Sequence, residues 1–354
     1  MMNEVPAPDF TTHSITAKEV LRAALRSGYI RYFFVVMAIL FLLLEVVGFI
    51  PDYQMMQNGQ FKVHWFAHFH GVVMTVWLGI FLTQSILASR GNLKFHRRLG
   101  LLSVWFGVFV WLTMAITTFR AQIGLNPPMA NDSQFDILFI QLYCLTLFGL
   151  FFTWGMRMRK NAAAHKRLLL LATLVIMQPA IDRMAILPEI YSAIYVRFLY
   201  LDTLLIPLLI YDWVNLVRIH KITALGVLLI GLLQVGIVVG WESPAWHRFW
   251  FNAISPFVEK VVEVKLKDAQ ADLLVGDYEG KPVGKMTIIR DNGTLYLQLN
   301  DQEKQAMGAR SETELFVKTV NVQFSFMKGA DGRVMKAIFH QGGQTFEMPK
   351  LNQP

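Results

Sequence analysis

The chain has 354 residues, and its composition separates it from ordinary globular proteins. Hydrophobic residues make up 54% and charged residues 16% of the sequence, whereas about a quarter of the residues in a soluble domain are charged. The formal net charge of +8 comes largely from Lys and Arg in short connections between apolar runs. It therefore indicates contact with a lipid bilayer and no nucleic-acid partner. The single cysteine, Cys144, excludes a disulfide scaffold and a CxxC metal or redox motif.

Apolar runs recur along the chain before residue 242, each long enough to cross the ~30 Å hydrocarbon layer of a membrane. Lys and Arg concentrate before the first run and in every second connection, which predicts a cytoplasmic N-terminus and an outside C-terminus. Residues 1–32 show no cleavable signal peptide, so we expect a cytoplasmic N-terminal segment and a first span that is its own insertion signal. We predict a multi-pass protein of the bacterial inner (plasma) membrane, whose transmembrane domain at residues 33–241 has seven spans: 33–51, 64–88, 99–118, 134–156, 167–188, 195–217 and 222–241.

Individual residues add detail to the prediction of this bundle. Pro179 and Pro207 fall inside the fifth and sixth spans and predict interrupted helices. The seventh span has four glycines and only Gln234 as a polar group, so we expect it to pack closely against its neighbours and to carry the C-terminal domain. Asp212, near the inner face, is expected to neutralise the basic connections.

The composition changes after Trp241 and predicts a small antiparallel all-β domain at residues 258–354, joined by a linker at 242–257. Residues 285–299 read as two alternating strands around Asn292-Gly293, the dipeptide most favourable to a tight hairpin turn. A second hairpin is expected around the glycine-rich turn at 329–332. On the predicted topology this domain is periplasmic or extracellular. The fold class is thus an all-α transmembrane bundle followed by a β domain.

The segment 274–280, Leu-Val-Gly-Asp-Tyr-Glu-Gly, and the hairpins that follow it resemble the small β-barrel domain appended to serine hydrolases of the β-lactamase class. The resemblance implies an accessory or assembly module that lacks catalytic residues and has a protein partner. Ser325-Phe326-Met327-Lys328 spells the SxxK pattern of those hydrolases. It falls in a predicted strand and not at a helix start, and no partner motif accompanies it, so we interpret it as a chance match.

Two similar segments open the third and fifth spans: His96-Arg97-Arg98-Leu99-Gly100 and His165-Lys166-Arg167-Leu168. They resemble a family of uncharacterised bacterial multi-spanning predicted membrane proteins, a resemblance that implies no activity. One interpretation makes His96 and His165 the axial ligands of a b-type haem in an electron carrier. The alternative is an interfacial cluster that contacts headgroup phosphates.

A second group of polar residues lies at one depth in the outer half of the bundle. Ionisable groups at such depth are costly, about 2.5–3.5 kcal/mol each on insertion scales, and ordinarily face the bundle interior. Five spans contribute to this layer, which suggests a cavity that opens to the outside: Glu45, His70, Gln141, Asp182 and Asp202, with His68 slightly shallower and Arg183 next to Asp182.

Three interpretations of the layer remain open. A divalent metal (zinc, iron or manganese) held by His68, His70, Asp182 and Asp202 would activate water against a lipid ester or amide, with Glu45 as the proton acceptor. The carboxylates Glu45, Asp182 and Asp202 are then catalytic. Without metal, the same groups with Gln141 and Arg183 would bind a small-molecule or lipid ligand or relay protons. In a structural network, Arg183 would neutralise Asp182 or Asp202. Nucleotide-binding and nucleophile-elbow motifs are absent from the sequence.

Overall fold

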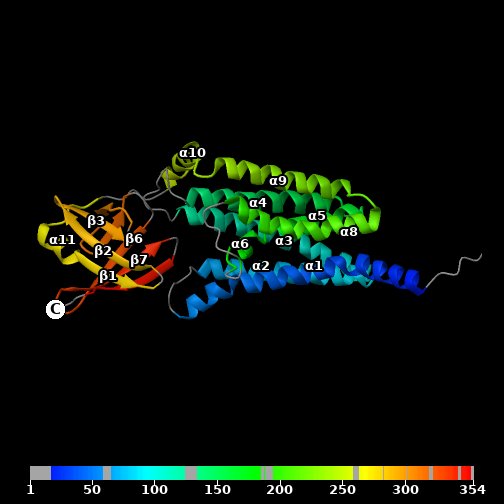
Figure 1. The fold of residues 1–354 in the computed structure, drawn as a ribbon, viewed down its shortest axis with the longest axis horizontal. Coiled ribbons are helices and arrows are strands. Elements are labelled where there is room, and N and C mark those ends of the chain that lie inside the picture. Colours follow the sequence, from blue (N-terminus) through cyan, green and yellow to red (C-terminus); the bar gives the residue numbers. More distant parts are fainter. Residues whose placement is uncertain are drawn as a thin grey trace, which may run out of the picture.

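The structure is a computed structural model that describes residues 17–58, 65–123, 134–184, 187, 194–257, 263–281, 283–300, 302–318, 322–341 and 344–351. A bundle of long helices occupies one end of the molecule and a β domain the other (Figure 1). The first half of the predicted N-terminal segment, the start of the predicted second span, the end of the predicted fifth span and the first residues of the predicted β domain lie outside the described residues. We refer below to the β-domain end and the N-terminal end of the bundle.

The described residues contain seven helical segments long and apolar enough to cross a membrane, which confirms the predicted number of spans. The protein is therefore a polytopic membrane protein. The first helix begins at Ala17 and runs without a break into the span, earlier than the predicted start at residue 33. Five spans are single helices: α1 (Ala17–Gln57), α2 (Trp65–Ser89), α3 (Leu93–Ile123), α4 (Gln134–Arg157) and α9 (Lys221–Gly240).

The fifth and sixth spans are interrupted near their prolines, as predicted. The fifth consists of α5 (Ala162–Val175) and a short α6 (Gln178–Ile181), with Pro179 in the first turn of α6. The sixth consists of α7 (Ile194–Asp202), η1 (Thr203–Leu205) and α8 (Ile206–Leu216), with Pro207 in the first turn of α8. Proline lacks the amide hydrogen that a helix interior needs, but the first turn tolerates it.

Close helix contact occurs where glycine removes a side chain. A Cβ atom on Gly48 of α1 would lie 2.3 Å from the carbonyl oxygen of Ala180 in α6, and one on Gly226 of α9 would lie 2.4 Å from Leu171 in α5. Gly231 of α9 instead faces open space. The prediction that the glycines of the seventh span allow close packing is therefore confirmed for Gly226 but not for Gly231.

A buried ion pair joins α5 to α8 near the N-terminal end of the bundle. Arg167 and Asp212 are 1% and 0% exposed, and Arg167 Nε donates to Asp212 Oδ1 at 2.8 Å. The remaining polar atoms are also bonded: Arg167 Nη1 donates to the carbonyl of Ala163, and Asp212 Oδ2 accepts from the backbone N–H of His220. Asp212 thus neutralises a basic residue, as the sequence predicted. Lys166 beside it donates to the Tyr211 hydroxyl at 2.6 Å.

The β domain is an eight-stranded antiparallel meander in which each strand pairs with the next one along the chain. It closes into a near-barrel because Tyr278 in β1 bridges to Lys350 just after β8. Its interior is filled with large side chains, including Tyr278, Phe324 and Met348. The strands are β1 (Gly276–Gly280), β2 (Gly284–Asp291), β3 (Thr294–Leu299), β4 (Gln305–Ala309), β5 (Glu314–Val317), β6 (Val322–Lys328), β7 (Val334–Gln341) and β8 (Gln344–Pro349), preceded by α11 (Asp268–Leu274).

The two predicted hairpins are confirmed. β2 and β3 meet at Asn292 and Gly293, which both have positive φ angles of 46° and 79°, as a type I′ turn requires. β6 and β7 meet at the turn that contains Gly332. Ser325 lies within β6, so the SxxK segment has no helix start.

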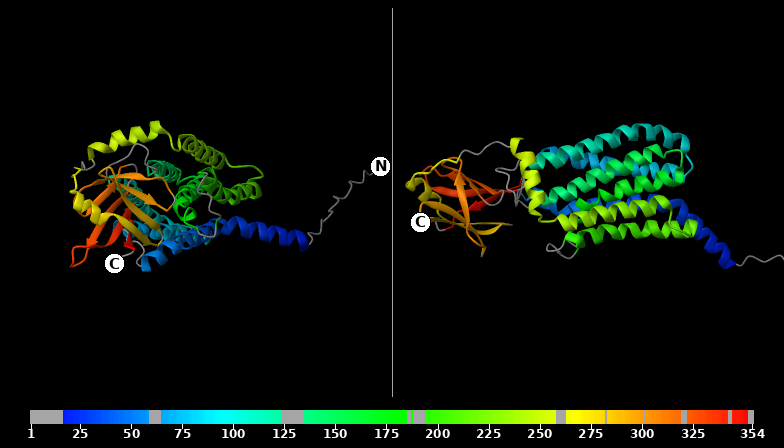
Figure 2. Two further views of the ribbon diagram at one scale, coloured as in Figure 1. Left: turned by 60° about the vertical axis from the view of Figure 1, so that its left-hand side comes forward. Right: turned by 90° about the horizontal axis from the view of Figure 1, so that it is seen from above.

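The segment between bundle and β domain is a helix and not the plain linker we predicted. α10 (Pro244–Ile254), followed by η2 (Ser255–Phe257), crosses the end of the bundle beside the β domain (Figure 2). His247 Nε2 lies 2.8 Å from Asp136 Oδ1 at the start of α4, and both side chains are buried. The indole of Trp246 stacks on Phe139 with ring centroids 3.5 Å apart. These contacts fix α10 to α4.

The Arg167–Asp212 pair gives a test of what organises the N-terminal end. Asp212→Asn leaves a buried guanidinium without a counter-charge, and we expect the free energy of unfolding to fall by about 3–5 kcal/mol. The double variant Arg167→Leu with Asp212→Leu removes both charges and should recover most of that loss. SDS titration of the protein in mixed micelles measures both. A double variant less stable than either single variant would contradict the pairing.

His220 predicts a pH dependence of stability. Its Nδ1 accepts a hydrogen bond from the backbone N–H of Ile222 at 3.1 Å and so caps α9. Burial, and then the charge of nearby Arg167, lower the pKa of His220 in the folded protein. Stability should be complete above pH ~6.5, the ordinary pKa of histidine, and decrease as the pH falls through the lowered pKa, because the unfolded chain then binds the additional proton. Melting temperatures between pH 8 and pH 5 test this, and His220→Asn, which retains a capping oxygen, should flatten the profile.

Candidate functional site: a polar core at the β-domain end of the bundle

Asp202 lies at the end of α7 within a hydrogen-bonded group that the sequence analysis did not assemble. Gln234 of α9 donates through Nε2 to Asp202 Oδ1 at 2.9 Å and to the Tyr143 hydroxyl of α4 at 3.4 Å. Gln234 and Tyr143 are buried. The seventh span therefore does more than pack, because its one internal amide joins α4 and α7 through the bundle interior.

Asp182 follows α6 and forms a second carboxylate–amide pair. Gln178 Nε2 donates to Asp182 Oδ1 at 2.8 Å and also reaches the Arg197 carbonyl of α7 at 3.4 Å. Gln178 is fully buried. Asp182 also lies within electrostatic range of Arg197 and of Cys144 in α4. Since Cys144 adjoins Tyr143, the two carboxylate–amide pairs line neighbouring parts of one interior region, which we call the polar core: Tyr143, Gln178, Asp182, Asp202 and Gln234.

The polar core contains more unpaired acceptor atoms than donors. Gln178 Oε1 is buried without a hydrogen-bond partner in the described part of the chain, and so is Oε1 of Gln141, about one helical turn before Cys144 on α4. The amide nitrogen of Gln178 is already used by Asp182. The one thiol at the site also points elsewhere, since Cys144 Sγ donates to the carbonyl of Val175 at 3.4 Å.

Glu45 and Arg183 lie on the contact between α1 and α6, beside the polar core. One of our interpretations made Arg183 the neutralising partner of Asp182 or Asp202. In the structure Arg183 forms its salt bridge with Asp52 instead. Its Nε donates to Asp52 Oδ2 at 3.0 Å, and its guanidinium lies 5.0 Å from the ring centroid of Phe49. Glu45 lies on α1 about one turn before Phe49. Its side chain is half-buried and lies within electrostatic range of Arg183. It forms no hydrogen bond with the residues that the structure describes.

The histidines of the predicted layer do not join these carboxylates. His70 Nδ1 lies 3.1 Å from the Thr113 hydroxyl of α3; because that hydroxyl donates to the carbonyl of Val110, the imidazole is the donor. His68 is exposed on α2. Within the described ranges, no group of three or more His, Cys, Asp and Glu residues is arranged to hold a metal ion. The predicted metal set of His68, His70, Asp182 and Asp202 is therefore not assembled in this structure.

The predicted haem ligands lie at the other end of the bundle. His96 is in the first turns of α3 and His165 in the first turns of α5, and both side chains are half-buried. Each Nδ1 contacts a backbone carbonyl of the preceding helix, Gln84 for His96 at 3.3 Å and Gly155 for His165 at 2.8 Å. They are separate from the polar core.

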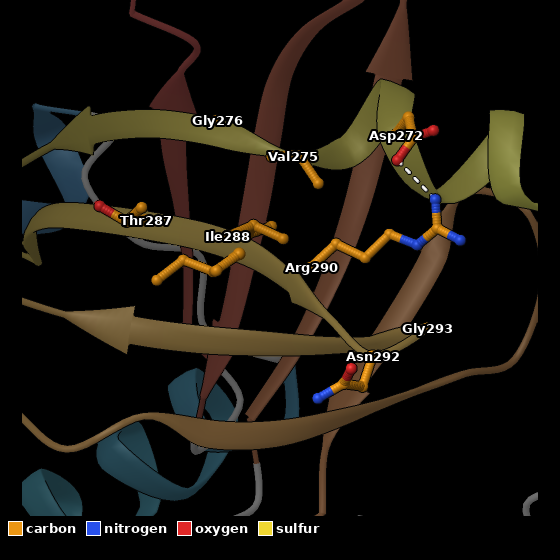
Figure 3. Close-up of a pocket in the computed structure, with 9 residues that line it drawn as sticks. Asp272, Val275, Gly276, Thr287, Ile288, Arg290, Asn292 and Gly293 are labelled. Carbon is orange, nitrogen blue, oxygen red and sulfur yellow. Dashed lines mark hydrogen bonds and ion pairs between the residues drawn. The ribbon is translucent and has the colours of Figure 1, made fainter.

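The β domain offers two weaker candidates. A hollow of about 620 Å³ lies between α11 and the β2–β3 hairpin, where Arg290 bonds to Asp272 (Figure 3). It is shallow and open, and its guanidinium is already paired. Ser325 Oγ lies 3.0 Å from His340 Nε2 on the outer surface of the barrel. Burial lowers the pKa of His340; because Ser325 and His340 lie on the paired strands β6 and β7, we interpret the contact as a cross-strand hydrogen bond.

The sequence analysis named Gln234 as the polar group of the seventh span without assigning it to a site, and it did not single out Gln178 or Tyr143. Gln234 carries a usable signal, since a lone glutamine in an otherwise apolar span needs a buried partner. Depth along the helix predicted Asp182 and Asp202 for one layer but gave no information on the rotation of each helix about its axis.

Comparison with known proteins adds no assignment, because no family model, curated protein or solved structure matches the chain. The resemblances stated from the sequence stay predictions.

Gln234 allows a test of the polar core on a single helix. Gln234→Leu leaves the Asp202 carboxylate without its buried donor, and we expect the free energy of unfolding to fall by about 1–3 kcal/mol. Gly231→Ala is the matched control on α9, since a Cβ there meets nothing within 4 Å. It should leave stability unchanged or slightly raised. Equal effects of the two substitutions in an SDS titration would show that Gln234 contributes nothing specific.

Proposed function

We propose that the protein binds a small organic cation in the polar core, reached from the side of the membrane on which the β domain lies. The observation that supports this most directly is the excess of acceptors: two half-buried carboxylates, each with one amide donor, next to two buried amide oxygens without partners. Such atoms are costly in an apolar interior unless a ligand donates to them.

The charges near the core favour a cation over an anion. Glu45, Asp182 and Asp202 carry formal negative charge, while the guanidinium of Arg183 is paired with Asp52. Among the described residues, Arg197 is the further cation within electrostatic range of Asp182. An ammonium group supplies both the missing charge and the missing N–H donors. Among the described residues, a bare metal ion finds fewer than three suitable ligands together.

Aromatic side chains next to Asp202 suit the organic part of such a ligand. Tyr143 of α4 and Phe198 of α7 are both buried, with ring centroids 5.7 Å apart. Ammonium groups are attracted to aromatic ring faces, by about 0.5–2 kcal/mol depending on desolvation. The proposal therefore assigns Asp182 and Asp202 to the charge, Gln178 and Gln141 to hydrogen bonding, and the rings to the carbon skeleton.

Ligand-dependent thermal stability tests the proposal. The protein in lipid nanodiscs is heated with ethanolamine, choline or putrescine, and with 3,3-dimethyl-1-butanol, the uncharged analogue of choline. A ligand that binds only the folded state stabilises it by about 2.7 kcal/mol at a concentration of 100 Kd. We expect at least one cation, and not the uncharged analogue, to raise the melting temperature.

Variants locate the binding site. Asp182→Asn and Asp202→Asn should each remove the ligand-dependent shift, whereas Asp277→Asn on β1 of the β domain should keep it. No shift with any cation, or an unchanged shift in both core variants, would contradict the proposal. A shift with zinc or manganese that depends on Asp182 would instead support the metal interpretation.

A further inference from the structure

A structural repeat at the N-terminal end of the bundle brings two histidines into equivalent positions. The α2–α3 and α4–α5 hairpins both turn at the end of the bundle away from the β domain (Figure 1). Asn92 precedes α3 and Asn161 precedes α5, and each side-chain oxygen accepts from the backbone N–H three residues later. The histidine follows one residue further on, as the fourth residue of each helix. The repeat reads N-x-x-x-H-[RK]-R-L in both hairpins.

Each imidazole places its Nδ1 near a backbone carbonyl of the preceding helix. His165 Nδ1 lies 2.8 Å from the Gly155 carbonyl oxygen. His96 Nδ1 lies 3.3 Å from the Gln84 carbonyl oxygen, and in the orientation that satisfies the Gln84 side chain its amide nitrogen donates to the same Nδ1. Neither Nε2 atom has a hydrogen-bond partner among the described residues. Histidines that bind metal commonly fix Nδ1–H on a carbonyl in this manner and present Nε2 to the metal.

The two histidines lie near each other although they are far apart in the sequence. His165 is close enough to His96 for their charges to interact, and both are half-buried at the N-terminal end of the bundle.

The number of ligands distinguishes between possible occupants. A zinc site built by a protein uses three or four side chains, and the described residues contain no group of three or more His, Cys, Asp and Glu suited to one. A haem needs only two protein ligands, because the porphyrin supplies four nitrogens. We propose that His96 and His165 are the axial ligands of a haem bound between the two hairpins, independently of the polar core.

The residues next to the histidines suit the rest of the cofactor. The apolar spans provide surroundings for the macrocycle, while Arg97 and Arg98, which follow His96, are exposed. Their guanidinium groups are suited to the two propionate carboxylates of a haem at the membrane boundary. The same arginines would also suit lipid phosphates, but phosphate binding does not explain two Nε2 atoms without partners.

Absorption spectroscopy tests the proposal. The full chain, purified in mild detergent, is titrated with haemin and then reduced with dithionite. We expect saturation at one haem per chain, with the sharp Soret and α bands of a six-coordinate low-spin haem after reduction. His96→Ala and His165→Ala should each abolish the low-spin spectrum, whereas His68→Ala, on the exposed surface of α2, should keep it.

Two further measurements distinguish a folding defect from the loss of an axial haem ligand. The melting temperature of each variant is recorded without haemin. For His96→Gly and His165→Gly, added imidazole should restore the low-spin bands, since it can occupy the vacated axial position. Absence of a Soret shift in the wild-type chain, or low-spin spectra in both alanine variants, would overturn the proposal. Binding of anionic-lipid vesicles that is weakened by Arg97→Gln with Arg98→Gln, in a chain that takes up no haem, would assign these residues to headgroup phosphates.

Discussion

The ion pair between Arg167 and Asp212 is the constraint on which the N-terminal end of the bundle depends. Both groups are removed from solvent, so each requires the other and every remaining polar atom must be bonded. Ala163 and the backbone N–H of His220 complete the bonding. Because Asp212 binds the residue that caps α9, the pair fixes α5, α8 and the start of α9 together. Arg167 also follows His165 by two residues, so the same pair restrains the helix that presents the proposed haem ligand.

The bundle thus separates two polar regions with an apolar interior. The region at the N-terminal end is densely hydrogen-bonded around its ion pair, although among the described residues Thr223 Oγ1 of α9 is buried without a partner and the two Nε2 atoms form no hydrogen bond. The polar core at the β-domain end is rich in acceptors. Between them lie buried apolar side chains such as Leu171, Leu174 and Leu208. A binding function at either end therefore does not require a continuous polar path through the membrane.

Two sets of contacts link the helices that border the polar core to the β-domain end of the molecule. α10 is fixed to α4 through Asp136 and His247, and Met55 and Met56 at the end of α1 pack against the β-domain core. α4 and α1 also carry Tyr143 and Glu45. Of the helices that border the candidate site, α1 therefore contacts the β domain directly, whereas α4 contacts α10, which precedes that domain in the chain.

The amino-acid sequence by itself determined the seven spans, both proline breaks and both hairpins, because each depends on local chemistry: apolar length, a missing amide hydrogen, and the positive φ that Asn292 and Gly293 adopt. It also located Asp182 and Asp202 by depth, and noted the repeat around His96 and His165. Only the tertiary structure decided which polar groups meet. Gln234 with Asp202, Gln178 with Asp182 and Arg183 with Asp52 depend on how far each helix is rotated about its axis. In spans that are hydrophobic on nearly every side, no stripe of residues records that rotation.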